Sequence, residues 1–566
     1  MNRTKIIATL GPAVAGKNKM KALIKAGCNI ARINTAHGEP EDYLRYINTF
    51  REASEELQRV TGVLLDIKGP ELRTGDIKGD TVTLTAGEKL TLTPEPVLGD
   101  AKCLHINADI APHVNKRDAI LIDDGKIRLE VIEIKGKEVI TRIIRGGVIK
   151  ARRGVNIPGR VIECPYLTKR DRASLKFAVE HGIDFIAASF TRSSSDIYEI
   201  KSEIADLGGW IPVIAKIENK SGIRTIDNIL AVADGIMVAR GDLGVELPVE
   251  QVPSAQKHLL RRAARQAKPA IIATQILESM VNNATPTRAE VSDIANAILD
   301  GTDALMLSEE SAMGKYPVEA VKMLARAAHA AEAMLLRRKR FPELVGGISH
   351  NMSNASVMLA KQVHARAIVC VTRSGKTARL ISRHKPQPPV IVATYSPETL
   401  RRTTILWGTS GFVVPHGDTT DEVIENTMQE ALKRGLIHRK DVLVVSASDP
   451  SGIPGTTNVV RVHIMGNIIG RGRAFGPARI SGRAVFETGK QENTKRSILV
   501  SERMPSIDIM TKFLGVIIDS DCYDPYVLKL AQKKGLTIMA GVKGILNRVK
   551  EGDTLNIDPL RGVIWH

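Results

Sequence analysis

A unit made of one short apolar run and one helical segment recurs eight times in the first 310 residues of this 566-residue chain. The runs are apolar throughout instead of alternating, which is typical of parallel strands covered on both faces. Eight such units predict a closed (β/α)₈ barrel, an α/β fold of the TIM type. The expected strands are residues 4–9, 29–34, 62–66, 185–190, 212–218, 235–240, 270–275 and 304–309.

The segments between these runs have the spacing of amphipathic helices. Residues 17–28, 171–181 and 291–300 each keep their apolar side chains on one helical face. Thr168 and Asp171 have the spacing of a capping box and predict a helix start at this point. Helices therefore follow strands in the order that a barrel requires.

One insertion interrupts the barrel pattern. Residues 72–156 contain period-two alternation, as in TVTLTAGEKLTLT, and a hairpin pattern around Asp124-Gly125. We expect a small all-β lid domain here, inserted into a barrel formed by residues 1–71 and 157–332.

Two further domains are expected after the barrel. Residues 333–468 alternate strands with helices and predict an open α/β sheet, whose strands are residues 367–372, 389–394, 411–415 and 441–447. Residues 470–566 predict an extra β-rich α/β domain. Its strands are residues 478–486, 497–502 and 515–520, followed by two short strands and a turn in 552–566.

Composition excludes several classes of protein. Apolar residues make up 43% of the chain and charged residues 25%, which is ordinary for a globular protein and unlike a disordered one. No apolar run approaches the roughly 18 residues that a membrane span needs, and no signal-peptide pattern follows Met1. We expect a cytoplasmic protein with no membrane partner.

The cysteines indicate neither a zinc site nor a disulfide framework, because they are far apart, odd in number and without a Cys-x-x-Cys pair. We expect them to be core thiols in a reducing compartment. They are Cys28, Cys103, Cys164, Cys370 and Cys522.

The formal net charge of +18 and the pI of about 9.6 favour anionic partners, either nucleic acid or acidic metabolites. Aromatic residues are only 4% of the chain, which argues against surfaces that stack bases. We expect no nucleic acid partner. Steeply salt-dependent retention on DNA would support the opposite interpretation.

Polar residues stand at the carboxyl ends of seven of the eight expected strands. In a (β/α)₈ barrel these ends converge on one mouth, where catalytic groups lie. So many charged groups would be costly to bring together without a ligand. The residues are Arg32, Asn34, Asp66, Lys68, Ser189, Lys216, Glu218, Asn219, Arg240, Gly241, Asp242, Thr274, Gln275, Ser308 and Glu309.

The residue types at this mouth suit phosphoryl transfer. Glu218 and Asp242 offer carboxylate oxygens for Mg²⁺ or Mn²⁺. Arg32, Arg73 and Lys216 supply positive charge for a phosphate. A hydroxyl, such as that of Thr274, could position a proton. Phosphoryl transfer needs little more than positioning and charge stabilisation.

Long motifs in this chain closely resemble those of pyruvate kinases over about residues 3–465. The resemblance implies transfer of phosphate from phosphoenolpyruvate to ADP in glycolysis, giving pyruvate and ATP. It also implies a barrel, an inserted lid, an effector domain and a homotetramer. The motifs are TKIIATLGPA, ARINTAHG, LDIKGPELRTG, RGVNIPG, KIENKSG, MVARGDLGVELP, ATQILESM and PTRAE with NAILDGTDALMLSEE.

The resemblance also implies roles for individual residues. Lys216, Thr274 and Arg32 would be catalytic: Lys216 stabilises the phosphoryl group in flight, Arg32 contacts the substrate phosphate, and Thr274 lies near the carbon that is protonated. Glu218 and Asp242 would hold the divalent metal. The residues expected to bind phosphoenolpyruvate are Arg32, Ser189, Lys216, Gly241, Asp242 and Thr274.

Two further sites follow from the resemblance. Arg73 and Arg153 would face the nucleotide, although the family more often has lysine at the second position. For a potassium site, Asn34 and Asp66 match the family, and Glu71 matches potassium-dependent members. Ala36 lacks the usual hydroxyl, and Ile67, where the family has threonine, can offer only its carbonyl. Whether potassium is a cofactor stays open.

The segment TRSGKT, residues 372–377, follows an expected strand and opens a helix. The family's effector pocket uses a similar loop, so Ser374, Gly375 and Thr377 are candidate contacts for a phosphorylated regulator. The alternative is an ordinary Ser/Thr helix cap.

Residues 470–566 resemble the mobile phosphohistidine domain of phosphoenolpyruvate-utilising enzymes, on the matches GRAFGPARISGRAV, SILVSERMPS, KKGLTIMAGV and GDTLNIDP. That family carries its phosphoryl group on a Thr-Ser-His segment. The aligned residues here are Asp524-Pro525-Tyr526, with no histidine nearby. We therefore expect a structural or regulatory domain.

The function best supported by the sequence is that of a pyruvate kinase. The alternative is a non-catalytic sensor of a phosphorylated metabolite on the same fold. The presence of Lys216, Glu218, Asp242 and Thr274 argues against this alternative, and an ATP-forming assay separates the two.

Overall fold

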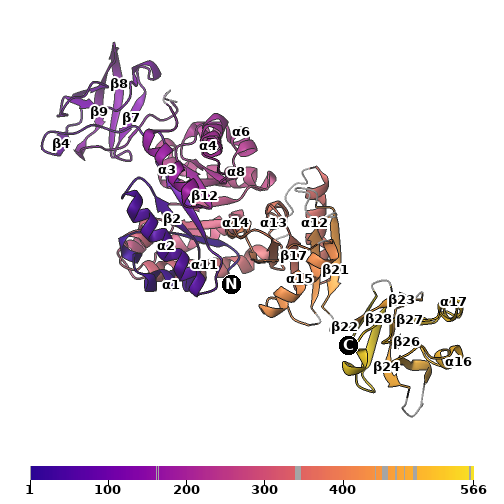
Figure 1. Ribbon diagram of the computed structural model, residues 1–566. Coiled ribbons are helices and arrows are strands. Elements are labelled where there is room, and N and C mark those ends of the chain that lie inside the picture. Colours follow the sequence, from indigo (N-terminus) through magenta and orange to yellow (C-terminus); the bar gives the residue numbers. More distant parts are fainter. Residues whose placement is uncertain are drawn as a thin grey trace. The chain divides into compact units, whose positions relative to one another are not determined.

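A computed structural model of the chain is shown in Figure 1. It forms two compact units, residues 1–430 with 444–461, and residues 431–443 with 462–566. The structure describes residues 2–160, 162, 165–337, 346–417, 419–439, 441–448, 457–465, 468–476, 479–487, 494–559 and 562–566.

The first unit contains a closed barrel of eight parallel strands, which confirms the expected fold. Each expected strand is present, and its bounds lie within two residues of the predicted ones. Around the barrel the order is β1-β16-β15-β14-β13-β12-β3-β2. The strands are β1 (Lys5–Thr9), β2 (Cys28–Asn34), β3 (Gly62–Ile67), β12 (Phe185–Ala188), β13 (Val213–Ile217), β14 (Gly235–Ala239), β15 (Ala270–Ala273) and β16 (Ala304–Leu307).

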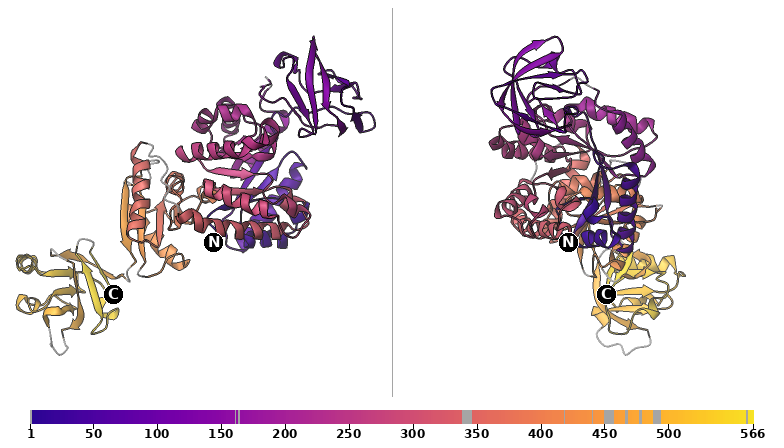
Figure 2. Two further views of the ribbon diagram at one scale, coloured as in Figure 1. Left: turned by 180° about the vertical axis from the view of Figure 1, so that it is seen from behind. Right: turned by 90° about the vertical axis from the view of Figure 1, so that its left-hand side faces the viewer.

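Helices lie around the outside of these strands (Figure 2). The expected capping box is present, because Thr168 and Asp171 bond reciprocally at the start of α3. The helices are α1 (Lys17–Ala26), α2 (Pro40–Glu56), α3 (Lys169–Glu180), α4 (Ser194–Asp206), α5 (Lys220–Arg224), α6 (Ile226–Val232), α7 (Arg240–Glu246), α8 (Val252–Arg265), α9 (Arg288–Asp300), α10 (Glu309–Ala312) and α11 (Pro317–Arg337), with short 3₁₀ turns η1 (Pro12–Val14), η3 (Val249–Gln251) and η4 (Glu278–Val281).

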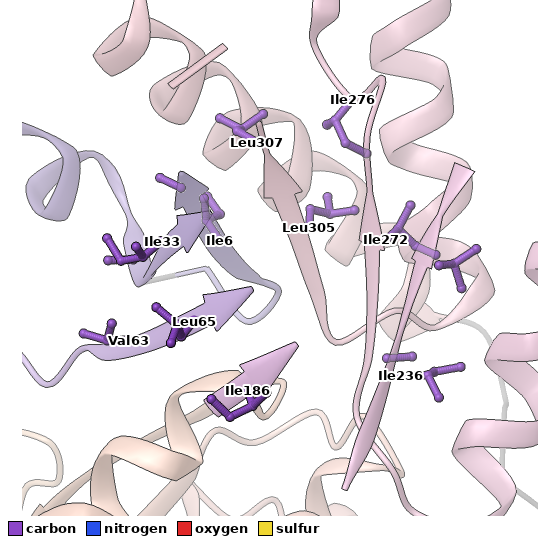
Figure 3. Close-up of a cluster of buried hydrophobic side chains, with 14 of the residues drawn as sticks. Ile6, Ile33, Val63, Leu65, Ile186, Ile236, Ile272, Ile276, Leu305 and Leu307 are labelled. Carbon is purple, nitrogen blue, oxygen red and sulfur yellow. The ribbon is translucent and has the colours of Figure 1, made fainter. Parts of the chain in front are cut away.

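The main core lies between the barrel strands and these helices. Figure 3 shows Ile33, Leu65, Ile186 and other apolar side chains of this layer, each fully or almost fully buried. In a strand, successive side chains point to opposite faces. Residues of the other parity, such as Arg32 beside Ile33, therefore point toward the barrel axis.

The insertion between β3 and α3 is all-β, as expected. The hairpin around Asp124-Gly125 is confirmed by the pairing of Ile122 with Ile127. A six-stranded sheet has the order β11-β7-β8-β9-β5-β6, and a two-stranded sheet pairs β10 with β4. The elements are β4 (Thr81–Leu84), β5 (Lys89–Thr93), β6 (Cys103–His105), η2 (Ala111–His113), β7 (Ala119–Ile122), β8 (Ile127–Lys135), β9 (Glu138–Arg145), β10 (Gly147–Lys150) and β11 (Val155–Asn156).

An open α/β sheet follows the barrel, with the order β19-β18-β17-β20-β21 among the described residues. The four expected strands are present, and β21 is an additional strand. The elements are α12 (Ile348–Gln362), β17 (Ala367–Val371), α13 (Lys376–Ser382), β18 (Val390–Thr394), α14 (Pro397–Arg402), η5 (Thr403–Ile405), β19 (Thr409–Val413), α15 (Thr420–Lys433), β20 (Val442–Ala447) and β21 (Val459–Ile464).

The C-terminal part of the chain forms an eight-stranded mixed sheet with the order β22-β29-β28-β24-β25-β26-β27-β23. Helices α16 (Ile507–Met510) and α17 (Pro525–Lys533) lie beside each other on it (Figure 1). The strands are β22 (Ile468–Arg471), β23 (Arg473–Phe475), β24 (Ile480–Phe486), β25 (Ser497–Ser501), β26 (Gly515–Ile518), β27 (Thr537–Ala540), β28 (Thr554–Asp558) and β29 (Val563–Trp565), with turns η6 (Thr494–Arg496) and η7 (Ile545–Asn547). The exact boundaries between the four domains stay predictions.

The cysteines only partly match their expected burial. Cys28 and Cys370 are buried thiols, and burial raises the pKa of Cys28 to about 12. Cys103 is half-buried and Cys522 is exposed, so neither is a core thiol as expected. Cys164 lies outside the described residues. No helix in the described part of the chain is long and apolar enough to cross a membrane.

Tyr526, which the sequence alignment sets opposite the histidine of a phosphoryl carrier, lies in the first turn of α17. Pro525 is the first residue of α17, and the Tyr526 side chain is 75% exposed. The only histidine in residues 470–566 is the terminal His566. This part of the chain therefore lacks a nitrogen nucleophile at the start of α17.

We predict that residues 470–566 do not carry a phosphoryl group. Incubation of the full chain with ³²P-labelled phosphoenolpyruvate, followed by denaturation and peptide mapping, should show no acid-labile label in this segment. Ending the chain near residue 468, where β22 begins, should leave transfer from phosphoenolpyruvate to ADP measurable while lowering thermal stability or changing the effector response. Stoichiometric label in residues 470–566 would contradict the prediction.

Candidate active site

The carboxyl ends of β2, β3 and β13 bring three charged side chains into the barrel mouth. Arg32, Asp66 and Lys216 alternate with residues of the outer apolar layer, so they point inward. Their side chains are only 10%, 2% and 11% exposed. Charged groups buried this deeply require partners.

Arg32 and Asp66 form the first pair of this network. The Nε and Nη2 atoms of Arg32 both lie 2.8 Å from Asp66 Oδ2, and Nη1 donates to Thr9 Oγ1 at 3.0 Å. Burial alone would raise the pKa of Asp66, but the positive charges of Lys216 and Arg32 hold it below its usual value. Asp66 is therefore ionised at neutral pH.

Lys216 lies between two carboxylates. Its Nζ atom donates to Ser189 Oγ at 2.7 Å and lies 3.1 Å from Glu218 Oε1 and 3.3 Å from Asp66 Oδ1. Ser189 in turn donates to Asp66 Oδ1 at 3.1 Å. Burial works to lower the pKa of Lys216, but attraction to Asp66 and Glu218 outweighs it and raises the pKa. The ammonium is thus a fixed positive charge.

Glu218 and Asp242 form a pair of buried carboxyls. The Phe190 amide donates to Glu218 Oε2 at 2.5 Å, and the negative charge of Asp242 acts on Glu218. Burial raises the pKa of Glu218 to about 7, with Lys216 opposing the rise and Asp242 adding to it. Burial likewise raises the pKa of Asp242. The pair lacks enough positive charge to ionise fully.

This pair fits a divalent metal. Carboxylate oxygens are suitable ligands for Mg²⁺ or Mn²⁺, and two additional positive charges would allow both groups to ionise. Among the described residues, no three His, Cys, Asp or Glu side chains are arranged to hold a metal by themselves. Remaining ligands would have to be oxygens of substrate or water.

Thr274 follows β15 in a left-handed backbone conformation, with φ of 64° at Thr274 and 54° at Gln275. This conformation is unfavourable for a β-branched residue and needs outside support. Arg240 Nη2 donates to the carbonyls of Thr274 and Gln275 at 2.9 and 3.0 Å, and Arg240 also pairs with Asp293. Arg240 therefore holds this turn in place.

The hydroxyl of Thr274 is oriented by two backbone groups. It accepts from the Gly241 amide at 2.8 Å and donates to the Ala273 carbonyl at 2.6 Å. Gly241 and Asp242 lie in the first turn of α7, so this contact joins the ends of β14 and β15. Sequence reasoning noted Arg240 at a strand end but assigned it no role, and it missed Asp293.

The two arginines expected at the nucleotide lie together in the lid, where Arg73 pairs across a β-bridge with Gly154. Arg73 Nε donates to Glu71 Oε2 at 2.8 Å, while Arg153 Nη1 lies 3.7 Å from Asp123 Oδ1. Both side chains are therefore engaged with lid acceptors.

A cavity of about 300 Å³ lies beside them, and Glu71, Gly154, Lys220 and Asp242 are among its lining residues. It reaches from the lid to the carboxyl pair and has space for part of a nucleotide. Sequence reasoning did not single out Lys220, which lies in the KIENKSG motif.

The residues expected at a potassium site lie together, but most of their oxygens are used. Asn34 and Asp66 are paired positions of β2 and β3, and Asn34 Oδ1 accepts from the Ala36 amide at 3.1 Å. Ile67 is fully buried. The hydroxyl of Thr35 donates to the Asp66 carbonyl at 2.9 Å and does not replace the hydroxyl missing at Ala36.

The expected effector loop lies in the α/β domain and not in the barrel mouth. Gly375 has φ of 78°, and its amide donates to Thr372 Oγ1 at 3.0 Å. Thr377 is buried, with its hydroxyl 2.6 Å from that of Thr457, whereas Ser374 is exposed. The loop is thus a turn stabilised by Thr372, with the Ser374 hydroxyl facing outward.

Family models match most of the chain. The model described as "Pyruvate kinase, barrel domain" matches residues 1–321, and "Pyruvate kinase, alpha/beta domain" matches residues 350–463. In the crystal structure of a pyruvate kinase from Cryptosporidium parvum the fold is similar, with a TM-score of 0.76 and 32% identity. That match covers 82% of this chain and 96% of the other.

Curated relatives match the full length. The chain is 38% identical over 580 residues to the pyruvate kinase of Geobacillus stearothermophilus, covering 100% of this chain and 98% of that protein. The pyruvate kinase of Bacillus licheniformis is 36% identical over 582 residues, with 100% and 99% covered. These bacterial relatives therefore extend over the C-terminal domain as well. The chain belongs to the pyruvate kinase family, whose members transfer a phosphoryl group from phosphoenolpyruvate to ADP.

Proposed function

We propose that this chain performs phosphoryl transfer with Arg32, Lys216 and Thr274 as its catalytic side chains. The P–O bond to the enol oxygen of phosphoenolpyruvate breaks, a new P–O bond forms to the terminal phosphate of ADP, and the enolate takes up a proton at its methylene carbon. The observation that carries the proposal is the buried, permanently charged Lys216 between Asp66 and Glu218.

Lys216 and Arg32 act on the phosphoryl group. A fixed ammonium stabilises the negative charge on the phosphoryl oxygens while the group lies between donor and acceptor. Arg32 is held by Asp66 and Thr9, so its guanidinium is oriented before substrate binds. Little reorganisation is then needed during the reaction. Ser189 is hydrogen-bonded to both Lys216 and Asp66 and so fixes the position of one charge relative to the other. Its hydroxyl would also contact phosphoenolpyruvate.

Glu218 and Asp242 are the groups that would hold Mg²⁺ or Mn²⁺. When bound, such an ion neutralises charge on phosphate oxygens and orients donor and acceptor. The protein's own contribution is the carboxyl pair, together with the Phe190 amide that fixes the Glu218 oxygen. Ionisation of both carboxyls would prepare them for a cation.

Thr274 is placed to guide the proton to the enolate carbon. Its hydroxyl is fixed by Gly241 and Ala273, and its backbone is fixed by Arg240. A hydroxyl held between one donor and one acceptor can hold a water in position, and that water would supply the proton. Gly241 and Asp242 would complete the phosphoenolpyruvate contacts.

For the nucleotide we propose Arg73 and Arg153 of the lid, above the cavity that reaches Asp242. Each arginine would exchange a lid acceptor for a phosphate oxygen of ADP or ATP. Such exchange is favourable because charge-assisted pairs with phosphate are strong.

The proposal extends to the oligomeric state, the compartment and an effector. We propose that the chain forms a homotetramer in the cytoplasm. We also propose that a phosphorylated effector binds with its phosphate group at Ser374, Gly375 and Thr377. The non-catalytic sensor is the alternative, and a coupled assay with phosphoenolpyruvate, ADP and Mg²⁺ decides between them. Formation of ATP at rates typical of enzymes excludes the sensor.

We expect Lys216→Met to reduce turnover by at least ~10³, the scale of losing a charge contact made in the transition state. Binding of Mn²⁺, followed by electron paramagnetic resonance, should persist because Glu218 and Asp242 remain. Lys116→Met, at an exposed lid position, is the control and should retain full activity. Near-normal turnover of Lys216→Met would refute the assignment.

Potassium activation should be weak or absent, since Ala36 offers no hydroxyl ligand. The measurement is initial rate against KCl, with tetramethylammonium chloride holding ionic strength constant. Ala36→Ser should raise the activation by potassium, because it restores the missing ligand. Full dependence of the unmodified chain on low millimolar K⁺ would show that the remaining oxygens suffice.

Arg240→Met should lower kcat by about 10²-fold, because the turn that presents Thr274 loses both of its hydrogen bonds to the guanidinium. Arg240→Lys should recover part of the loss, since one ammonium can reach a carbonyl. Binding of Mn²⁺ should remain unchanged. If Mn²⁺ binding fell as much as kcat, Arg240 would support the structure of the whole mouth and not the Thr274 turn in particular.

A further inference from the structure

A second cavity lies at the amino ends of the barrel strands, opposite to the mouth. Its volume is about 810 Å³. Ala270, the first residue of β15, lines it on the barrel side together with the end of α8. Val357 of α12 and Arg379 of α13 line it on the α/β side. The cavity is thus shared by two domains of the first unit.

We call this cavity the basal cavity. Its walls carry a large excess of positive charge. Of the described residues that line it, nine are lysine or arginine and two are aspartate, an excess of seven positive charges. Both aspartates are already paired, Asp300 with Lys257 and Asp303 with Lys385. Even if Asp227 and Asp234 behind the wall are counted, the excess is five.

Several of these groups show that the positive charge is incompletely compensated. Burial and neighbouring Arg379 lower the pKa of Lys268 to about 8, although Asp234 opposes the shift. Among the residues that the structure describes, neither the buried Arg379 Nε nor His384 Nδ1 has a hydrogen-bond partner. Arg383 Nε donates to His384 Nε2 at 3.3 Å, so the proton of neutral His384 lies on Nδ1. Two N–H donors in the wall therefore lack acceptors.

The cavity is too large and too apolar for a bare inorganic ion. Its volume lies in the range of sites for small organic ligands. Leu260, Leu335, Val357 and Pro386 contribute apolar lining next to the cations. An occupant should therefore have a compact organic body and a strongly anionic end.

We propose that the basal cavity binds a small metabolite carrying one or two phosphate groups, at a site separate from both the barrel mouth and the 372–377 loop. Guanidinium groups bind phosphate oxygens in pairs and supply the donors that such a group needs. Arg261 and Lys361, both exposed at the cavity, are the cations that an entering phosphate meets without displacing a carboxylate.

The position of the basal cavity connects such a ligand to the catalytic turn. Asp303 pairs with Lys385 and also accepts from the amide of Ala270 at 3.0 Å. Ala270 begins the short strand β15, which ends immediately before Thr274. A phosphate that competes with Asp303 for Lys385 therefore acts on the base of the strand that carries Thr274.

Isothermal titration of the full chain tests binding without any need for activity. The probes are glucose 6-phosphate, glucose 1,6-bisphosphate and inorganic phosphate, with glucose as the uncharged control. We expect both sugar phosphates to bind more tightly than inorganic phosphate, and glucose not to bind. The proposal is overturned if none of the phosphates binds at 10 mM, which is about the weakest affinity of interest. It is also overturned if the sugar phosphates bind no more tightly than inorganic phosphate.

Variants then locate the site. Arg261→Gln with Lys361→Gln should weaken sugar phosphate binding at least about tenfold, as loss of charge-assisted contacts predicts. Lys116→Gln with Lys137→Gln, the same charge change on the exposed lid, should leave binding unchanged. Ser374→Ala should also leave it unchanged, and phosphoenolpyruvate should not displace the probe. Loss of binding in either control, or displacement by phosphoenolpyruvate, places the ligand elsewhere and overturns the proposal.

Discussion

The rest of the barrel mouth depends on the pairing of Lys216 with Asp66 and Glu218. An ammonium with only 11% of its side chain exposed would lose its proton without close negative charge. Strands β3 and β13, with β12 between them, must pair in register to bring the Lys216 ammonium within 3.3 Å of both carboxylates. The same closure that buries the apolar layer outside the strands therefore creates the charged cluster inside them, so the stability of the barrel and the chemistry of its mouth share one origin.

The two ends of the barrel carry charge imbalances of opposite sign. At the mouth, Asp66, Glu218 and Asp242 outnumber Arg32 and Lys216, and burial raises the pKa values of Glu218 and Asp242 although Lys216 opposes the rise. At the base, arginine and lysine outnumber aspartate, and burial together with the positive charge of Arg379 lowers the pKa of Lys268. We propose that a divalent cation completes the first and a phosphate group completes the second. Strand β15 spans the distance between them.

Three positions with an unfavourable backbone conformation lie where the chemistry would take place. Phe190, Thr274 and Gln275, all at strand ends of the mouth, have positive φ without being glycine. Each is held by a polar contact, since the Phe190 amide donates to Glu218 and Arg240 binds the carbonyls of Thr274 and Gln275. Such conformations persist only when surrounding contacts determine them. The rigidity of these turns is thus supplied by side chains that do not themselves react.

The amino-acid sequence by itself determined the eight barrel strands, the all-β insertion, the helix start at Thr168 and the charged residues at the strand ends, because periodicity and capping depend on near neighbours in the chain. It also pointed to Lys216, Glu218 and Asp242. Only the tertiary structure decided that β21 joins the α/β sheet, that Arg240 and Asp293, 53 residues apart, support Thr274, and that residues from 257 to 406 enclose a cationic cavity. Such contacts join segments remote in sequence, and local patterns carry no information about which distant groups chain folding will bring together.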